Sequence, residues 1–290
     1  MKGRGDGRAQ ARVPVARRRR ALGQHYLRDA RLARAIVELA QPTPDDLVVE
    51  IGPGTGALTA LLAGRAGRLL ALEVDEVLAG RLRSRFAESE RVEICLADAR
   101  SFDYAKLPAL VPSPEGRVVV VGNLPYSVSK PILFRLIEAR TAISSLTLML
   151  QKEVAERVVA EPGSKRYGSL SVLTQLYTAP RLAFTAPPGA FAPPPEVESA
   201  VVHFMVLPEP RVPLADEAAF CRVVKAGFGQ RRKTLANALS GGLALSVETA
   251  RQWLTASGID PARRAETLTL EEFARLSSRI PSGDTGRVVR

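Results

Sequence analysis

The sequence predicts an α/β protein in which a doubly wound parallel sheet is followed by a small all-helical domain. Between residues 30 and 180, short β-branched runs alternate with amphipathic stretches, as in sheets whose strands are joined by helices. After the proline-rich segment Pro208–Pro213, every periodic stretch has the spacing of a helix. The 290 residues are 46% hydrophobic, which is enough for one large domain and one small one.

Five short apolar runs predict the parallel sheet. We expect strands at Leu47–Ile51, Leu69–Glu73, Val92–Leu96, Val118–Val121 and Leu146–Leu150. The helices between them are expected at Ala30–Ala40, Ala57–Ala63, Glu76–Phe86 and Pro131–Ala139. Strands that are covered on both faces are continuously apolar, as these runs are.

The rest of the chain is predicted to close the sheet and then to form helices. Helices at Lys152–Ala160 and Leu170–Tyr177 precede strands at Arg181–Thr185 and Ala200–Leu207, expected as an antiparallel pair at the sheet edge. Further helices are expected at Glu217–Phe228, Arg231–Leu239, Val247–Ser257 and Leu270–Ile280. The chain therefore divides into a disordered basic arm (1–16), an α/β domain (17–208), a helical domain (209–282) and a mobile tail (283–290).

The net charge of +11 is unevenly distributed. Residues 1–20 carry eight basic side chains against one acid. A cluster such as Arg17–Arg20 beside a folded domain favours phosphate backbones, although a solubilising tail fits this composition equally well. No apolar stretch has the length of a membrane span, and no apolar segment of a secretory signal follows Arg20.

Cysteine and histidine usage narrows the class of protein. Cys95 and Cys221 are too few for a disulfide framework and lack metal-ligand spacing, so we expect a cytoplasmic protein without a metal site. With His25 and His203 as the only histidines, a histidine-based metal centre is disfavoured. The absence of a Gly-x-Ser-x-Gly elbow argues against a serine hydrolase.

A glycine-rich turn follows the first predicted strand. Glu50–Gly56 leads from that strand into a helix, so backbone N–H groups at the turn approach a ligand closely. Such a loop alone also fits nicotinamide-binding enzymes. Glu50 before the loop, Pro53 between the first two glycines and the short spacing to Gly56 favour S-adenosyl-L-methionine as the cofactor.

Acidic side chains end the next two predicted strands. We expect Gly52 and Gly54 to contact the cofactor, Glu73 to hold its ribose hydroxyls and Asp98 to accept from its adenine amino group. Either acid alone fits a helix cap as well. Three such features at successive strand ends are hard to attribute to capping.

The quartet Asn123-Leu124-Pro125-Tyr126 follows the fourth predicted strand. The exocyclic amino group of a nucleobase is a poor nucleophile because its lone pair is delocalised into the ring. The Asn123 side-chain carbonyl and the Leu124 backbone carbonyl would localise that lone pair by accepting hydrogen bonds from the N–H groups of the amino nitrogen. Pro125 stiffens the turn, and Tyr126 offers a face on which a flipped base can stack. An isolated quartet of this kind is more often a tight turn, so its weight comes from the adjacent cofactor loop.

Two further segments favour a nucleic-acid substrate. Phe191 opens the proline run Phe191–Pro195 and is predicted to stack on the base opposite Tyr126, although a core phenylalanine fits as well. Arg231, Arg232 and Lys233 are predicted to open a helix, where three cations oppose the macrodipole. Contact with the phosphates of a nucleic acid would explain these three cations, and the alternative is that they are ordinary solvated surface charges.

Taken in order, these motifs resemble the bacterial small-subunit (16S) ribosomal RNA adenine dimethyltransferases. The resemblance covers about residues 17 to 280 and rests on Leu22–Leu27, Glu50–Gly56, Asp98, Asn123–Tyr126, Gln151–Val154, Tyr167–Ser171, Phe191–Pro195, Ser199–Val202 and Gln230–Thr234. Resistance methylases that act on large-subunit RNA belong to the same superfamily.

The resemblance implies a Rossmann-like, S-adenosyl-L-methionine-dependent methyltransferase domain and a helical RNA-docking domain. The family places two methyl groups on N6 of each of two adjacent adenosines in a loop near the 3′ end of 16S rRNA, in the immature small subunit. Carried over by position, the cofactor contacts fall on His25, Leu27, Gly52, Glu73, Asp98 and Asn123. One departure is that His25-Tyr26 stands where the family usually has Asn-Phe.

Two other functions remain open on the sequence. One is a large-subunit (23S) rRNA adenine methylase that confers resistance, and the other is a non-catalytic ribosome assembly factor. The intact loop and quartet argue against a purely binding role. We expect a monomer that needs neither a membrane nor a metal.

Overall fold

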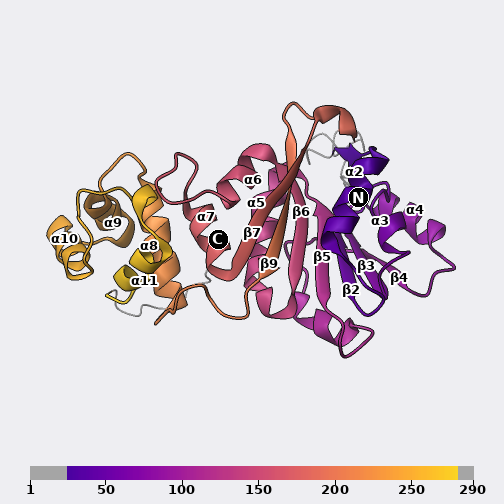
Figure 1. Cartoon of the computed structure of the whole chain (residues 1–290), viewed down its shortest axis with the longest axis horizontal. Coiled ribbons are helices and arrows are strands. Elements are labelled where there is room, and N and C mark those ends of the chain that lie inside the picture. Colours follow the sequence, from indigo (N-terminus) through magenta and orange to yellow (C-terminus); the bar gives the residue numbers. More distant parts are fainter. Residues whose placement is uncertain (1–24, 280–290) are drawn as a thin grey trace, which may run out of the picture.

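Strands and helices alternate along most of the chain, and only helices follow residue 206 (Figure 1). The structure is a computed structural model and describes residues 25–279, so the predictions for arm 1–16 and tail 283–290 lie outside the described residues. The strands are β1 (Tyr26–Leu27), β2 (Leu47–Ile51), β3 (Arg68–Glu73), β4 (Val92–Leu96), β5 (Val118–Asn123), β6 (Ser145–Gln151), β7 (Thr178–Ala186), β8 (Phe191–Ala192) and β9 (Ser199–Val206). The α-helices are α2 (Ala30–Ala40), α3 (Thr59–Leu62), α4 (Glu76–Arg85), α5 (Ser129–Glu138), α6 (Lys152–Val158), α7 (Ser169–Tyr177), α8 (Glu217–Gly229), α9 (Leu235–Leu243), α10 (Val247–Ala256) and α11 (Leu270–Ser277). Short 3-10 helices are η1 (Tyr104–Leu110), η2 (Tyr126–Val128), η3 (Arg140–Ala142), η4 (Pro188–Ala190) and η5 (Ala265–Thr267).

Seven strands form the main sheet in the order β4-β3-β2-β5-β6-β9-β7. The first five of these run parallel, and β9 is antiparallel to both β6 and β7, which confirms the predicted antiparallel pair at the edge. Strand order reverses between β2 and β5, where open α/β sheets bind their ligands. There Ile51 lies beside Leu72 of β3 and Gly122 of β5, so the predicted site segments meet at one edge.

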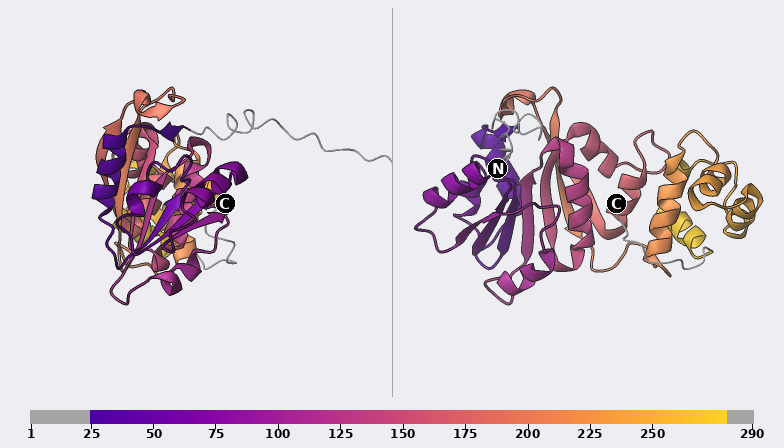
Figure 2. Two further views of the ribbon diagram at one scale, coloured as in Figure 1. Left: turned by 90° about the vertical axis from the view of Figure 1, so that its right-hand side faces the viewer. Right: turned by 180° about the vertical axis from the view of Figure 1, so that it is seen from behind.

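Helices cover both faces of the sheet (Figure 2). On one face, α2 and α3 pack on Val48, Val119 and Val121. On the other, α5 and η1 pack on Val49 and Val120. Because side chains alternate along a strand, the consecutive valines of β5 fill both layers, as the continuous apolar runs predict.

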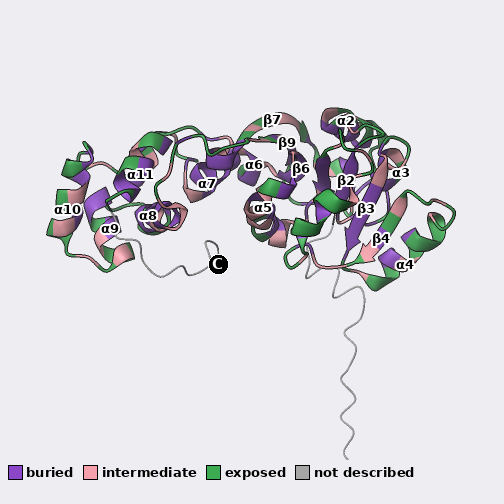
Figure 3. Cartoon of the chain, turned by 90° about the horizontal axis from the view of Figure 1, so that it is seen from below, coloured by how far each residue is buried: buried purple, intermediate pink, exposed green. Residues whose placement is uncertain are grey.

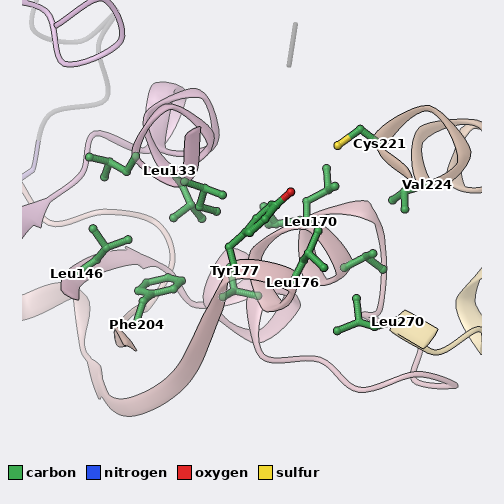
Figure 4. Close-up of a cluster of buried hydrophobic side chains, with 14 of the residues drawn as sticks. Leu133, Leu146, Leu170, Leu176, Tyr177, Phe204, Cys221, Val224 and Leu270 are labelled. Carbon is green, nitrogen blue, oxygen red and sulfur yellow. The ribbon is translucent and has the colours of Figure 1, made fainter. Parts of the chain in front are cut away.

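The apolar core continues from the sheet into the helical part (Figure 4). Tyr177 at the end of α7 packs in one cluster with Cys221 and Val224 of α8. The segment that contains the predicted boundary is anchored rather than loose. The backbone N–H of Arg211 donates to Leu176 O over 2.7 Å, and its side chain donates to Gln175 O and Thr178 O. Figure 3 shows buried residues running through both parts.

Two local predictions were wrong or incomplete, and one strand pairing was not predicted. The predicted helix 57–63 is only Thr59–Leu62, because residues 54–58 form turns after the glycine loop. The predicted helix Arg231–Leu239 begins instead at Leu235, with Thr234 as its N-cap, so the three cations lie in the turn before α9. The pairing of β1 with β8 was not predicted, because two-residue strands carry no periodicity.

Two glycine substitutions test the packing next to the amino-terminal ends of β2 and β5, with a glycine of helix α4 as the control. A Cβ on Gly116 would lie 1.9 Å from the backbone oxygen of Asp45, whereas a Cβ on Gly80 of α4 meets nothing within 4 Å. We expect Gly116→Ala to lower the free energy of unfolding by about 1–3 kcal/mol. Gly80→Ala should raise it by about 0.5–1 kcal/mol, because alanine favours a helix interior. Denaturant unfolding of both variants measures the difference, and a neutral Gly116→Ala would contradict this packing.

Candidate active site

A cleft of about 370 Å³ lies at the carboxyl ends of β2, β3 and β5. It is lined by His25, Tyr26, Gly52, Gly54, Glu73, Asn123, Leu124, Pro125 and Tyr126. The structure thus brings together most of the residues that the sequence assigned to the cofactor and to catalysis.

The glycine loop needs its glycines for backbone conformation and for space. Gly52 and Gly54 have φ of +67° and +57°, a region that favours glycine. A Cβ on Gly54 would lie 2.8 Å from Cδ1 of Tyr26, so the tyrosine ring packs directly on the loop. The N-terminal segment therefore forms one wall of the cleft, although it precedes the sheet in sequence.

Glu73 holds the loop and the next strand end together. Its Oε2 accepts from the backbone N–H of Gly54 over 3.0 Å, and its Oε1 accepts from Val74 and Asp75 over 2.9 Å each. Burial raises the pKa of Glu73, and these three donors oppose the rise. A buried carboxylate that borders the cleft and has acceptor capacity left fits a ligand with vicinal hydroxyls, as a ribose has.

Glu50 lies beneath the loop on β2 and is 1% exposed. Desolvation raises the pKa of Glu50 to about 8, the polar groups of Thr59 oppose this rise, and the charge of Glu73 adds to it. Within the described residues, Glu50 Oε2 has no hydrogen-bond partner. A carboxyl group of this kind without a cation partner belongs to sites more often than to cores.

The Asn123 side chain is oriented by a single hydrogen bond. Its Nδ2 donates to the backbone oxygen of His25 over 2.9 Å. A carbonyl oxygen only accepts, so the amide nitrogen must face His25, and Oδ1 is left as the acceptor at the cleft. The turn itself is held by the N–H of Leu124, which donates to Met149 O of β6 over 3.1 Å.

The backbone carbonyls of the quartet are not equivalent. Pro125 O accepts from the N–H of Val128, and Tyr126 O accepts from the hydroxyl of Ser129. Among the described residues, no donor reaches Leu124 O. Asn123 Oδ1 and Leu124 O are therefore the pair of acceptors that the sequence predicts for an amino group.

Tyr126 is held by contacts at its hydroxyl and at its ring. Its OH lies 2.5 Å from Ser199 Oγ on β9, and its ring centroid lies 5.3 Å from that of His25. His25 Nδ1 lies 2.8 Å from Pro193 O, which ties the histidine to the proline-rich loop. Burial raises the pKa of Tyr126, so its hydroxyl stays protonated at neutral pH.

Two predicted cofactor residues lie outside the cleft lining. The side chain of Leu27 is 5% exposed and packs in the core, while its backbone pairs with Phe191. Asp98 lies after β4 and is engaged by Arg100, whose NH2 lies 2.6 Å from Asp98 Oδ2. The Arg100 hydrogen bonds hold the pKa of Asp98 below its usual range. For Asp98 to accept a hydrogen bond from adenine, its carboxylate must either bind adenine and Arg100 at the same time or release Arg100.

Phe191 occupies the core rather than the cleft. Its side chain is 4% exposed and packs with Leu27 and Val201. The structure therefore does not support the prediction that Phe191 stacks on a base opposite Tyr126. It supports the alternative, that Phe191 is a core residue. Because β8 pairs with β1, the side chain of Phe191 turns inward and its apolar ring is buried. The ring that faces Tyr126 is His25 instead.

The three cations before α9 separate into two kinds. Arg231 NH2 donates to Lys165 O over 2.9 Å and to Tyr167 O over 3.2 Å, and it pairs with Glu266 over 3.4 Å. These contacts assign Arg231 to holding the segment before α7 against the helical part. Arg232 and Lys233 are exposed. Of the three cations predicted to bind phosphate, these two face solvent and do not hold the segment before α7 as Arg231 does.

Sequence reasoning missed the residues that act through others. Ser199 positions the Tyr126 hydroxyl, and the His25 backbone orients Asn123. Both contacts join segments far apart in the chain, so no spacing pattern contains them. Within residues 25–279, no cluster of His, Cys, Asp or Glu suited to a metal ion is found. None of the helices in that range is long and apolar enough to span a membrane.

Comparison with known proteins shows the family of this chain. The family model for ribosomal RNA adenine dimethylase matches residues 15–281. A ribosomal RNA small subunit methyltransferase A of Geobacter metallireducens is 46% identical over 264 residues, which cover 90% of this chain and 94% of that protein. The protein of the same name from Alkaliphilus metalliredigens is 43% identical, over 90% of this chain and 91% of the relative.

Solved structures share the fold. A dimethyladenosine transferase of Plasmodium falciparum aligns with a TM-score of 0.70 over 87% of this chain and 96% of that one, at 24% identity. The 23S rRNA methyltransferase ErmE aligns with a TM-score of 0.65 over 89% of this chain and 100% of that one, at 25% identity. The predicted Rossmann-like methyltransferase fold with a helical C-terminal part is confirmed. The chain belongs to the ribosomal RNA adenine dimethylase family and is an S-adenosyl-L-methionine-dependent methyltransferase.

Proposed function

We propose that the protein dimethylates N6 of two adjacent adenosines in a loop near the 3′ end of 16S rRNA, in the immature small ribosomal subunit. The observation that carries the proposal is the pair of acceptors at the head of β5, with Asn123 oriented by the His25 carbonyl. The choice of subunit is supported by the curated relatives named for the small subunit, at 43–46% identity, against 25% for ErmE.

The described residues fit the cofactor on the observations above. Gly52, Gly54 and Glu73 border the space where its ribose would be held, and His25 and Asn123 line the same cleft. When bound, the cofactor supplies a methyl group on a positively charged sulfur. The loop glycines add no side chain of their own to that side of the cleft, which leaves room for the Tyr26 ring at Gly54.

Asn123 and Leu124 activate the attacking nitrogen without removing a proton first. Two acceptors on the N6 hydrogens localise the nitrogen lone pair, and their oxygens favour the positive charge that develops on it. The proton is lost after methylation, when the charged nitrogen is acidic, so no general base is required. Tyr126, with its hydroxyl on Ser199, offers the stacking surface for the flipped base.

The helical domain supplies the docking surface for RNA in this proposal. Arg232 and Lys233 are exposed in the turn before α9. Arg264 is exposed too and follows Arg263, whose carbonyl accepts from the N–H of Leu235 over 2.6 Å, so it belongs to the same surface. The basic arm, residues 1–16, adds non-specific attraction. We propose that the protein acts as a monomer.

Mapping of modified bases tests the proposed substrate. The protein is incubated with labelled cofactor and with immature small or large subunits, in separate reactions. We expect label on two neighbouring adenosines of 16S rRNA and none on large subunits. Label on 23S rRNA would favour the resistance methylase. Binding to small subunits without label on either RNA would favour the non-catalytic assembly factor.

Glu73→Gln tests the cofactor placement. The carboxylate also holds three backbone N–H groups, so glutamine disturbs the fold less than alanine does. Loss of a charge-assisted acceptor should weaken cofactor binding by about 1.5–3 kcal/mol, measured by calorimetry. Unchanged affinity in a folded Glu73→Gln variant would show that the ribose is held elsewhere.

Substitutions of the quartet separate chemistry from binding. Asn123→Ala should leave the Kd for immature subunits nearly unchanged and lower the single-turnover rate by orders of magnitude, because the acceptor acts in the transition state. Tyr126→Phe keeps the stacking face and loses only the Ser199 contact, so its rate should fall far less. Near wild-type methylation by Asn123→Ala would mean that the quartet is only a structural turn.

Salt dependence of binding tests the docking surface. Each lost phosphate contact flattens the slope of log affinity against log salt by about 0.9. Arg232→Gln with Lys233→Gln should flatten it for immature subunits, whereas Arg231→Gln should not, because Arg231 is engaged by Lys165 O and Tyr167 O. Removal of residues 1–16 should weaken binding to any RNA about equally. An unchanged slope and affinity in the double variant would leave those cations as ordinary solvated charge.

A further inference from the structure

A buried carboxyl group lies under the cofactor loop and has no role in the chemistry described above. Glu50 is on β2, between Ala71 of β3 and Val121 of β5, so its backbone is fixed by the sheet on both sides. It is 1% exposed, and its Oε2 has no partner among the described residues. A fully buried charge without compensation is costly, and such a group remains neutral instead.

Among the described residues, the groups that act on the pKa of Glu50 are Thr59 and Glu73, and neither is a cation. On the same face of the sheet, α2 and α3 contribute the apolar side chains of Ile36, Val37 and Leu62, and α3 adds the hydroxyl of Thr59. The charged neighbour on β3 is Glu73, which repels a second negative charge. From α4, Arg85 reaches the loop, with its NH1 3.2 Å from the position of a Cβ on Gly56.

Glu50 and Glu73 have different environments although both are glutamates near one loop. Glu73 has three backbone donors, which support a charged form. Glu50 has only the polar groups of Thr59, and Thr59 Oγ1 itself lacks a well-formed hydrogen bond. Burial raises the pKa of Glu50 to about 8, so the group is mostly protonated at neutral pH in the empty cleft.

We propose that Glu50 senses the charge of the cofactor: its carboxyl is neutral in the empty cleft, ionises when the positively charged methyl donor binds, and is neutral again with the thioether product. The donor carries one more positive charge than the product, and the cleft that would hold it is lined by Gly52, which follows Glu50 by two residues. Glu50 releases its proton to solvent when the donor binds and takes one up when the donor is replaced by the product. At Glu50 only the carboxyl O–H bond breaks and re-forms, the electron pair stays on the carboxylate, and the proton balance closes over one turnover.

This inference makes Glu50 a positioning residue that separates the donor from the product by charge. The ionised form attracts the donor and has no such attraction for the product. Since dimethylation of each adenosine needs cofactor exchange, a lower affinity for the product speeds that exchange. The inference rests on the cofactor assignment and on the cleft, but not on the choice of RNA.

Calorimetry of cofactor binding counts the protons directly. S-Adenosylmethionine and S-adenosylhomocysteine are titrated into the full chain at pH 7 in buffers that differ in ionisation enthalpy. We expect release of about one proton per donor bound and almost none for the product. The affinity for the donor should rise about tenfold per pH unit below pH 8 and level off above it, while that for the product stays flat. Glu50→Gln should abolish the release and the pH dependence.

His25→Asn is the matched control, because it changes another side chain that lines the cleft. Proton release should persist in this variant. Release that persists in Glu50→Gln, or that is lost in Glu73→Gln but kept in Glu50→Gln, overturns the inference. Equal proton counts for donor and product in the wild type overturn it too. If neither compound binds, the cofactor placement itself is wrong, which is a different failure.

A measurement on the empty protein covers the case in which Glu50→Gln binds no cofactor. A glutamate with a raised pKa in the folded state binds a proton that the unfolded chain releases. Its contribution to the free energy of unfolding is therefore present below about pH 4.5 and is lost as pH rises to about 8. The difference in unfolding free energy between wild type and Glu50→Gln should change across this window. A difference independent of pH would show that Glu50 is already ionised and would overturn the proposal.

Discussion

The register between β2 and β5 is the constraint on which the rest of the site depends. Ile51 lies opposite Gly122, so the glycine loop and the quartet leave the sheet side by side. A slip of one residue would move each valine of β5 into the opposite packed layer and shift the quartet along the glycine loop by about 3.3 Å. In the observed register the acceptor pair, the loop and Glu73 meet in one cleft.

Residues 25–27 complete the cleft that the carboxyl ends of the sheet strands form. β1 pairs with β8, Tyr26 packs on Gly54, and the carbonyl of His25 orients the Asn123 amide. His25 and Tyr26 stand where the family usually has Asn and Phe. The backbone carbonyl that holds Asn123 does not depend on that change, whereas the ring next to Tyr126 does. The departure thus affects the wall of the cleft and leaves the acceptor pair in place.

Much of the fold and the centre of the site were predictable from the sequence, for identifiable reasons. Buried parallel strands are continuous apolar runs, and their carboxyl ends share an edge, so Gly52, Glu73 and Asn123 were placed correctly relative to one another. The side chains that failed the prediction depend on tertiary contacts. Phe191 turns into the core because of a two-residue strand, and Arg231 binds carbonyls of a segment 64 or more positions away in sequence. No local pattern encodes either contact.

The central claim is that N6 of the target adenosine meets two oxygens at the head of β5. A crystal structure of the protein with S-adenosylhomocysteine and an adenosine-containing oligonucleotide tests it most directly. The account predicts that N6 lies within hydrogen-bond distance of Asn123 Oδ1 and Leu124 O, with Asn123 Nδ2 still on the His25 carbonyl. An adenine whose N6 contacts neither oxygen, or an Asn123 amide turned so that Nδ2 faces the base, would contradict it.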